Sequence, residues 1–197
     1  MKRLLIITVM CAVGFLSAIS FAEDSVYEPV PVMEHPSDNK GSKVKEELGK
    51  MLYFDPRLSG SNWISCATCH NPGLGWGDGL PRTIGDGQKE LGRHAPTIIN
   101  SGFFEVQMWD GRKKSLEDQA QGPIAATVEM NQDYDELIME LKALPGYVNR
   151  FEKVFGKNSL TIGNIAKAIA TFERSVVSKN APYDKYWAGD KSAMSSS

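Results

Sequence analysis

The chain has 197 residues, which suffices for one domain and is marginal for two. Its 22 Lys plus Arg and 24 Asp plus Glu give a net charge of −2, and the charged and apolar fractions of 23% and 42% are ordinary for a globular protein. No basic run is long enough to follow a phosphate backbone, so the composition argues against a nucleic-acid-binding protein.

The N-terminal residues have the pattern of a secretory signal peptide. Lys2 and Arg3 give a basic start, residues 4–19 are almost wholly apolar or small, and a small-x-small motif ends at Ala22. We expect cleavage after Ala22, so that residues 1–22 are a signal peptide and the mature chain is periplasmic. The alternatives are an uncleaved anchor and a lipoprotein signal. The apolar stretch is short for a membrane span, and no later run reaches spanning length, so we expect no membrane association after cleavage.

The remaining chain predicts an all-α domain with long loops. Residues 23–46 begin Pro-rich and polar and predict an extended N-terminal arm. Apolar periodicity and capping residues predict helices over 43–54, after the capping residue Ser115, and over 132–143, 146–155 and 161–177. Seven glycines between Asn71 and Gly92 predict an irregular loop. We expect a haem domain over 47–191 and a tail or linker over 192–197.

The haem is predicted by a single motif, Cys66-Ala67-Thr68-Cys69-His70. The C-x-x-C-H spacing is typical of c-type haem attachment, in which both thiols bind the porphyrin and the histidine is the axial ligand of the iron. A zinc site would need four ligands, and the mature chain adds only His35 and His94. A thioredoxin-like pair would lie in a βαβ unit, which the pattern lacks. The sequence therefore predicts one covalent haem c held by Cys66 and Cys69, with His70 as the iron ligand.

Further motifs follow in a fixed order along the chain. They are LGKMLYFDPRLS at 48–59, SCATCH at 65–70, GRHAPT at 92–97, WDGR at 109–112, QAQGPI at 119–124 and VEM at 128–130. In this series the region from about Glu47 to Lys191 resembles the N-terminal, peroxide-reacting domain of the bacterial dihaem cytochrome c peroxidases. That family also includes the dihaem enzymes of methylamine utilisation, which oxidise tryptophans of another protein. The resemblance implies a cytochrome c-like fold.

The resemblance also implies roles for individual residues. Glu129 would be the acid-base residue over the open face of the haem, and Gln119 its neighbour in the same pocket. Trp109 would lie on the electron route between two haems. Arg57 and Arg93 are candidates to pair with haem propionates, since arginine suits bidentate contacts with carboxylates. Asp110 and Arg112 are expected to hold the 109–112 turn together.

Three departures from the family pattern bear on function. Asp86 occupies the place where many members carry a histidine that blocks the iron, so we expect the iron to be five-coordinate or water-bound. His94 occupies the place of an asparagine that contributes to a calcium site, which leaves calcium open and makes His94 a candidate sixth iron ligand, as is any of the methionines. The chain contains no second C-x-x-C-H motif. We expect either a fragment or a single-haem relative, and favour the fragment.

The function implied by the resemblance is reduction of hydrogen peroxide to water by a c-type haem peroxidase. Electrons would come from a small periplasmic donor protein, either a cytochrome c or a cupredoxin. A homodimer is compatible with the resemblance. The residues alone leave two alternatives: a monohaem electron carrier with Met108 or another methionine as sixth ligand, and a haem-based sensor. An electron carrier needs a filled sixth position, whereas a peroxidase needs an open one.

Overall fold

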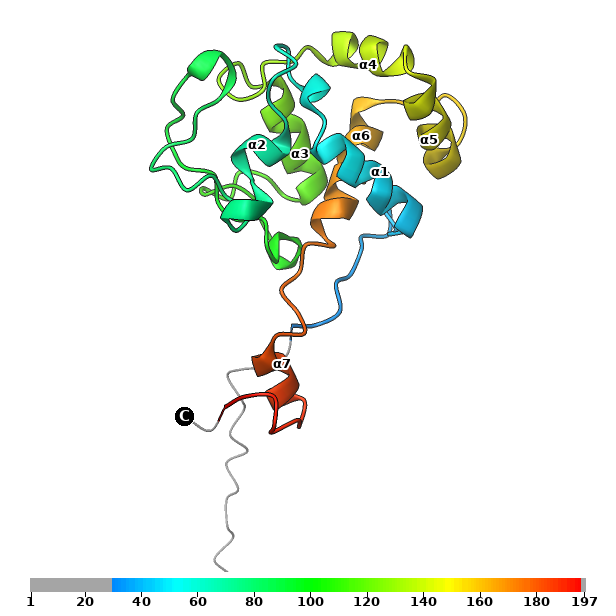
Figure 1. Cartoon of the computed structure of the whole chain (residues 1–197). Coiled ribbons are helices and arrows are strands. Elements are labelled where there is room, and N and C mark those ends of the chain that lie inside the picture. The colour runs from blue at the N-terminus through cyan, green and yellow to red at the C-terminus, as the bar shows by residue number, and fades with distance from the viewer. Residues whose placement is uncertain (1–29, 196–197) are drawn as a thin grey trace, which may run out of the picture.

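Two crossing helices, α1 (Lys43–Tyr53) and α6 (Ile162–Glu173), form the centre of the fold in the computed structural model, which describes residues 30–195. Gly49 allows them to approach closely, because a Cβ there would overlap the carbonyl oxygen of Ala168. Helix α3 (Leu116–Ala125) packs on α6, and the pair α4 (Tyr134–Lys142) and α5 (Pro145–Phe155) covers the other end of the α1–α6 crossing (Figure 1).

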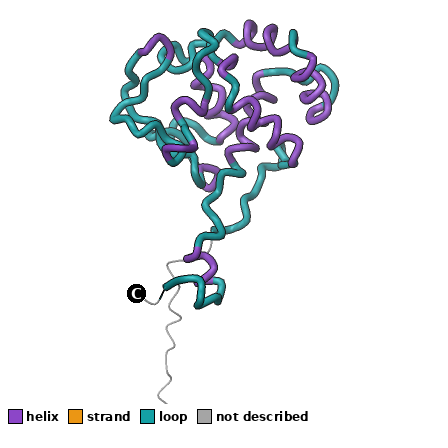
Figure 2. The backbone as a smooth tube through the Cα atoms, viewed as in Figure 1, coloured by secondary structure: helices purple, strands orange, loops and turns teal. Residues whose placement is uncertain are grey.

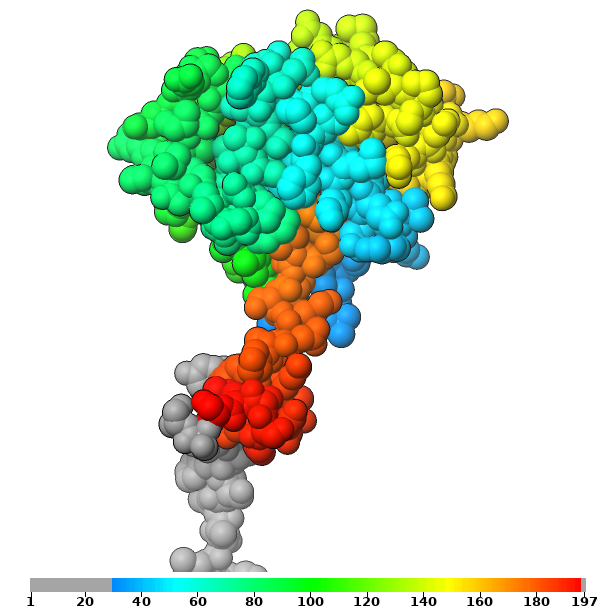
Figure 3. All heavy atoms as spheres, viewed as in Figure 1, coloured from blue at the N-terminus to red at the C-terminus, as the bar shows by residue number. Residues whose placement is uncertain are grey.

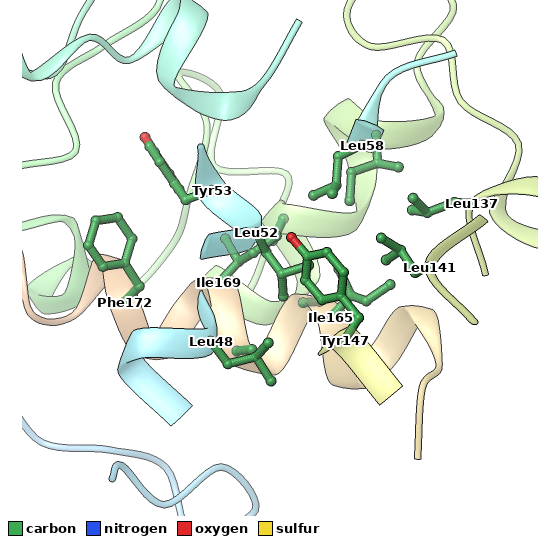
Figure 4. Close-up of a cluster of buried hydrophobic side chains, with 14 of the residues drawn as sticks. Leu48, Leu52, Tyr53, Leu58, Leu137, Leu141, Tyr147, Ile165, Ile169 and Phe172 are labelled. Atoms are coloured by element: carbon green, nitrogen blue, oxygen red, sulfur yellow. The ribbon is translucent and has the colours of Figure 1, made fainter. Parts of the chain in front are cut away.

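The core is built from the apolar faces of these helices. Figure 4 shows side chains of α1, α4, α5 and α6 directed toward one another. Its largest fully buried apolar side chains are Leu48, Leu52, Tyr53, Leu58, Ile124, Leu137, Leu141, Phe151, Ile165 and Ile169. Burying a side chain such as Leu52 or Phe151 away from water contributes roughly 1.5–3 kcal/mol to the stability of the fold. The core therefore lies on one side of the molecule, under four amphipathic helices.

The predicted helices are confirmed, and the predicted caps Ser115 and Thr161 are present, with Ser42 as a further cap that was not predicted from the sequence. Ser42, Ser115 and Thr161 each accept a backbone N–H bond from the residue three positions later. Gly156 ends α5 with a φ of 92°, in the region that glycine adopts without strain. Among residues 30–195 there is no strand, only three isolated β-bridges (Figure 2). The all-α expectation is confirmed.

One predicted helix end differs from the structure. The helix predicted to continue to Val177 ends at Glu173, because the carbonyl of Val176 accepts a hydrogen bond from the Asn100 amide, at 2.9 Å, instead of continuing the helix. Helix α1 begins at Lys43, as predicted, four residues before the expected start of the haem domain. The predicted signal peptide lies outside the described residues.

The end of the N-terminal arm is fixed to the body by Asn39, whose side chain is 1% exposed. Its amide accepts from Lys45 Nζ of α1 (2.9 Å), and donates to Glu117 of α3 (2.7 Å) and to the Lys167 carbonyl of α6 (3.0 Å). Glu117 in turn forms an ion pair with Arg174, with both side chains largely buried. Four segments are thus joined through one polar cluster, Asn39–Lys45–Glu117–Arg174.

The long connection between α1 and α3 is mostly irregular. It contains α2 (Cys66–Cys69) and four single turns of 3-10 helix: η1 (Pro56–Leu58), η2 (Pro72–Leu74), η3 (Asp86–Gln88) and η4 (Ser101–Phe103). After α6 the chain leaves the body, and α7 (Pro182–Trp187) lies apart from it (Figure 3). Within residues 30–195 no helix has the length and apolarity needed to cross a bilayer.

Candidate haem site

The C-x-x-C-H motif forms one helical turn at the start of the irregular connection. The Ser65 amide donates to Thr68 Oγ1 at 3.0 Å, which begins the turn, and the His70 amide donates to the Cys66 carbonyl at 2.9 Å, which closes it. Within this turn both cysteines are free and half-buried. Burial raises the pKa of both thiols, that of Cys69 to about 11. They are therefore neutral thiols directed into the protein and available for thioether formation.

The His70 ring is fixed by its second nitrogen. Nδ1 lies 2.9 Å from the carbonyl oxygen of Pro96, and since a carbonyl only accepts, Nδ1 carries the hydrogen. Nε2 then keeps its lone pair. Burial also lowers the pKa of His70, which favours the neutral ring. A neutral imidazole oriented through its other nitrogen is the usual form of a histidine ligand.

A cavity of about 620 Å3 opens beside this turn. Cys66, Cys69 and His70 line it, together with Gly85 and Gly92 of the glycine-rich loop. Its volume is in the usual range for cofactor pockets. The thiol pair, the oriented histidine and the cavity beside them fit a covalently attached haem c.

The wall formed by α3 carries Gln119. Ser115 caps this helix through the Asp118 amide at 3.1 Å, which places Gln119 in the first turn. The helix contains Pro123 and ends at Ala125, and its side toward the cavity includes Gln119, Ala120 and Pro123. The described contacts include no hydrogen bond from the Gln119 side chain to protein, so its amide is available to a ligand.

Glu129 reaches the same cavity from a tight turn after α3. The Met130 amide donates to the Pro123 carbonyl at 3.1 Å, and the Gln132 amide donates to the Ile124 carbonyl at 2.8 Å, so the chain folds back along the end of the helix. Glu129 is half-buried and lines the cavity with Gln119. Burial raises its pKa, an effect that the positive charge of Arg112 opposes.

The rim of the cavity is formed by the 93–112 segment. Arg93 and Arg112 both contact Asp110, at 3.0 and 2.8 Å, and both line the cavity. The expected contact between Asp110 and Arg112 is therefore present. Arg112, whose role could not be read from the sequence, is a second candidate beside Arg93 for pairing with a cofactor carboxylate.

Trp109 and His94 lie together on this rim. The Trp109 Nε1–H donates to the His94 carbonyl at 3.0 Å, and the two rings meet edge to face with centroids 4.9 Å apart. Trp109 is 56% exposed. Of the methionines considered as a sixth ligand, only Met108 and Met130 line the cavity.

One of the two arginine candidates lies away from the cavity. Arg57 does not line the cavity; its guanidinium binds Asp55 at 2.7 Å and lies over the Tyr147 ring, with 5.6 Å between Cζ and the ring centroid. The Tyr147 hydroxyl also donates to Asp55. Arg57 therefore stabilises the turn after α1 rather than a haem propionate.

Two polar residues of the cavity were not identified from the sequence. Tyr53 of α1 and Glu173 of α6 line it, and both have a buried side-chain oxygen without a protein partner. Burial raises the pKa of Glu173 to about 8. The sequence signal that could have identified Glu173 is its place as a single acidic residue at the end of the most apolar helix, α6. Across residues 30–195, no group of three or more His, Cys, Asp or Glu side chains is arranged to hold a metal ion.

Comparison with known proteins identifies the family of the chain. The family model of the di-haem cytochrome c peroxidases matches residues 43–192. The chain is 46% identical over 168 residues to the methylamine utilization protein MauG of Methylorubrum extorquens, a match that covers 85% of the chain and 47% of that protein. It is 39% identical over 175 residues to the cytochrome c551 peroxidase of Pseudomonas aeruginosa, with 86% and 50% covered.

Solved structures show the same fold. A MauG-like protein associated with microbial copper homeostasis superposes with a TM-score of 0.77 at 29% identity, over 84% of this chain and 50% of that one. The chain spans about half the length of the relatives that it matches. From the extent of the family match and the identity to these relatives, the chain belongs to the di-haem cytochrome c peroxidase family.

Proposed function

We propose that this chain is the peroxide-reacting haem domain of a periplasmic peroxidase. It would reduce H2O2 to two waters with two protons and two electrons, the electrons coming from a small redox protein such as a cytochrome c or a cupredoxin. Two relatives are named cytochrome c551 peroxidase, which supports this substrate and donor class. The predicted signal peptide supports the periplasmic location.

The observation that carries the proposal is the convergence of two sets of residues on one cavity. Cys66, Cys69 and His70 come from the irregular connection, whereas Gln119 and Glu129 come from α3 and the turn after it. An attachment site alone would suit an electron carrier. A half-buried carboxylate and a free amide beside it are what proton transfer to peroxide requires.

Each residue then has a defined task. His70 would hold the iron through Nε2, with its ring fixed by the bond from Nδ1 to Pro96. Haem, when bound, supplies the iron that binds peroxide and the electrons that reduce it. The Glu129 carboxylate would take a proton from bound peroxide and return it to the departing oxygen. The Gln119 amide would orient the peroxide by hydrogen bonding.

The environment of Glu129 suits that exchange. Burial raises its pKa from the ordinary value of 4.5. A proton-transfer group is most effective when its pKa approaches the working pH, because it must both accept and release the proton. Arg112 opposes the rise and keeps the carboxylate available as a base.

The test is an optical titration of the oxidised, haem-loaded chain with stoichiometric H2O2. We expect a high-spin spectrum that changes rapidly on addition of peroxide, and a loss of about 100-fold or more in that rate in Glu129→Gln. Glu140→Gln is the matched control, since Glu140 is an exposed glutamate on α4 that lies outside the cavity.

A low-spin spectrum that peroxide leaves unchanged would refute the proposal, because the iron would then be capped. Equal rates in Glu129→Gln and Glu140→Gln would refute the role of Glu129.

Trp109, exposed at the rim, is the residue that we propose for the electron route. Its replacement by Phe should slow reduction of the oxidised haem by a donor protein while leaving the reaction with peroxide unchanged.

A further inference from the structure

The glycine-rich loop forms a second support for Glu129, independent of α3. Its segment 83–91 turns back on itself at η3, with the Gly85 amide bonded to the Lys89 carbonyl at 2.9 Å and the Leu91 amide bonded to the Thr83 carbonyl at 2.8 Å. This turn lies directly against residues 126–131, the segment that carries Glu129. Thr83, Gly85 and Leu91 line the haem cavity on one side of the turn.

Asp86 is at the centre of the contact between the two segments. Its backbone amide donates to the carbonyl of Glu129 itself at 2.8 Å, and its Oδ2 accepts from Asn131 Nδ2 at 3.1 Å. Asp86 is thus hydrogen-bonded to the chain at Glu129 and again at Asn131, two residues later. Its side chain is buried at 8% exposure.

Two more contacts extend the same junction. Lys89 Nζ donates to the Thr127 carbonyl at 3.1 Å. Gly85 packs so closely on the Val128 carbonyl that a Cβ would overlap it. Each of the residues 126–129, which precede Met130, is therefore in contact with either this turn or the end of α3.

The buried carboxylate is costly for a merely structural contact. Asp86 Oδ1 is buried and has no protein partner, and a buried polar atom left without a hydrogen bond costs about 1–3 kcal/mol. A neutral residue could fill the same space without that cost. The Asp86 carbonyl accepts from the Lys89 amide within the turn, at 3.4 Å. The side-chain bond of Asp86 and the bond of its backbone amide both go to the segment that carries Glu129.

We propose that Asp86 is a positioning residue for Glu129: through Asn131 and the Glu129 carbonyl it fixes the turn that holds this carboxylate over the haem cavity. This rests on the proposed role of Glu129. The requirement for precision is strict, because a displacement of about 1 Å at a reacting group reduces rates by as much as 100-fold. Asp86 therefore supports the acid-base group from the loop side, as α3 supports it from the helix side.

The experiment compares four variants of the haem-loaded chain. Asp86→Ala removes the side-chain bond. Asp86→Asn is the conservative rescue, since its Oδ1 still accepts from Asn131. Asn131→Gly removes the donor, and glycine tolerates the φ of 51° found at that position. Glu90→Ala is the matched control: it removes an exposed carboxylate of the same loop, which pairs with Arg82.

Two measurements are made on each variant. The first is the rate constant of the spectral change on addition of peroxide. The second is hydrogen exchange of the backbone amides of residues 126–131, which reports on the turn without any turnover. We expect Asp86→Ala and Asn131→Gly to slow the reaction about tenfold and to accelerate exchange, and Asp86→Asn and Glu90→Ala to stay within about twofold of the parent.

Combination with Glu129→Gln separates positioning from general damage. If Asp86 acts through Glu129, then Asp86→Ala adds no further loss in the Glu129→Gln background. An equal further loss there, or a parent-like rate and parent-like exchange in both Asp86→Ala and Asn131→Gly, would overturn the inference. Failure of the proposed function would give a different result, because the Glu129→Gln chain would then react as fast as the parent. If Asp86→Ala does not fold, Asn131→Gly still decides the outcome.

Discussion

Replacing Glu117 by Gln should remove a defined part of the acid sensitivity of the fold. Burial works against ionisation of Glu117, but hydrogen bonds from Arg174 and Asn39 outweigh it and lower its pKa to about 2, against an ordinary value of 4.5. A carboxylate with a lowered pKa stabilises the folded state above its unfolded-state pKa. That contribution is lost as the pH falls through the folded-state value.

The size of the effect follows from the two pKa values. A difference of two and a half units corresponds to about 3 kcal/mol of stability at pH 7, at 1.36 kcal/mol per unit. The same relation leaves about 1 kcal/mol at pH 3. Little is lost to solvent screening, since the Glu117 side chain is 14% exposed and that of Arg174 is 7% exposed.

The assay is urea unfolding of the haem-loaded parent and of Glu117→Gln at pH 7 and at pH 3. We expect the gap in unfolding free energy between the two chains to shrink by about 2 kcal/mol from pH 7 to pH 3. Glu140→Gln, which changes an exposed glutamate, should show no such gap at either pH. A gap between parent and Glu117→Gln that is the same at both pH values would refute the reasoning, because it would mean that Glu117 titrates alike in the folded and unfolded chains.

Three further results are expected. Gly49→Ala should lower the unfolding free energy by about 2 kcal/mol in urea titrations, since its Cβ overlaps the Ala168 carbonyl; a stabilised variant would mean that helix propensity outweighs this clash. The rate of the peroxide reaction should fall in acid through a pKa above 4.5, because burial favours the protonated form of Glu129; stopped-flow rates that stay flat down to about pH 4 would contradict this. His94→Ala should leave the spin state of the oxidised haem unchanged in its optical spectrum, since the His94 ring packs on Trp109; a shift from low to high spin would identify His94 as the sixth ligand.

The helices could be predicted because their signals are local. Apolar periodicity together with Ser115, Thr161 and Gly156 placed most ends within a few residues. The end of α6 could not be predicted in this way. The apolar pattern continues to Val176, but that residue is bonded to Asn100, which lies far away in the sequence.

The part of the site that could be predicted is the part formed by residues adjacent in the sequence. The thiols and the imidazole of the C-x-x-C-H motif must lie close together to hold one haem, so their spacing is informative. Glu129 and Gln119 have no such local pattern and were identified only through resemblance. The burial of Tyr53 and Glu173 depends on how α1 and α6 cross, and the partner of Arg57 depends on where α5 places Tyr147. These relations appear only in three dimensions.

The uneven distribution of the core has a consequence for maturation of the protein. Between Leu58 and Leu116 the only buried apolar residue is Ile98, whereas the helices on either side supply nearly all the rest. The helical body therefore holds most of the fully buried apolar contacts, whereas the segment that carries Cys66 and Cys69 adds partly buried ones, from Ile64, Ala67 and Trp76. We expect this segment to stay accessible while its thiols are joined to porphyrin, and to close only around the attached ring. In such an order of assembly, the cofactor is the last piece of the core to arrive.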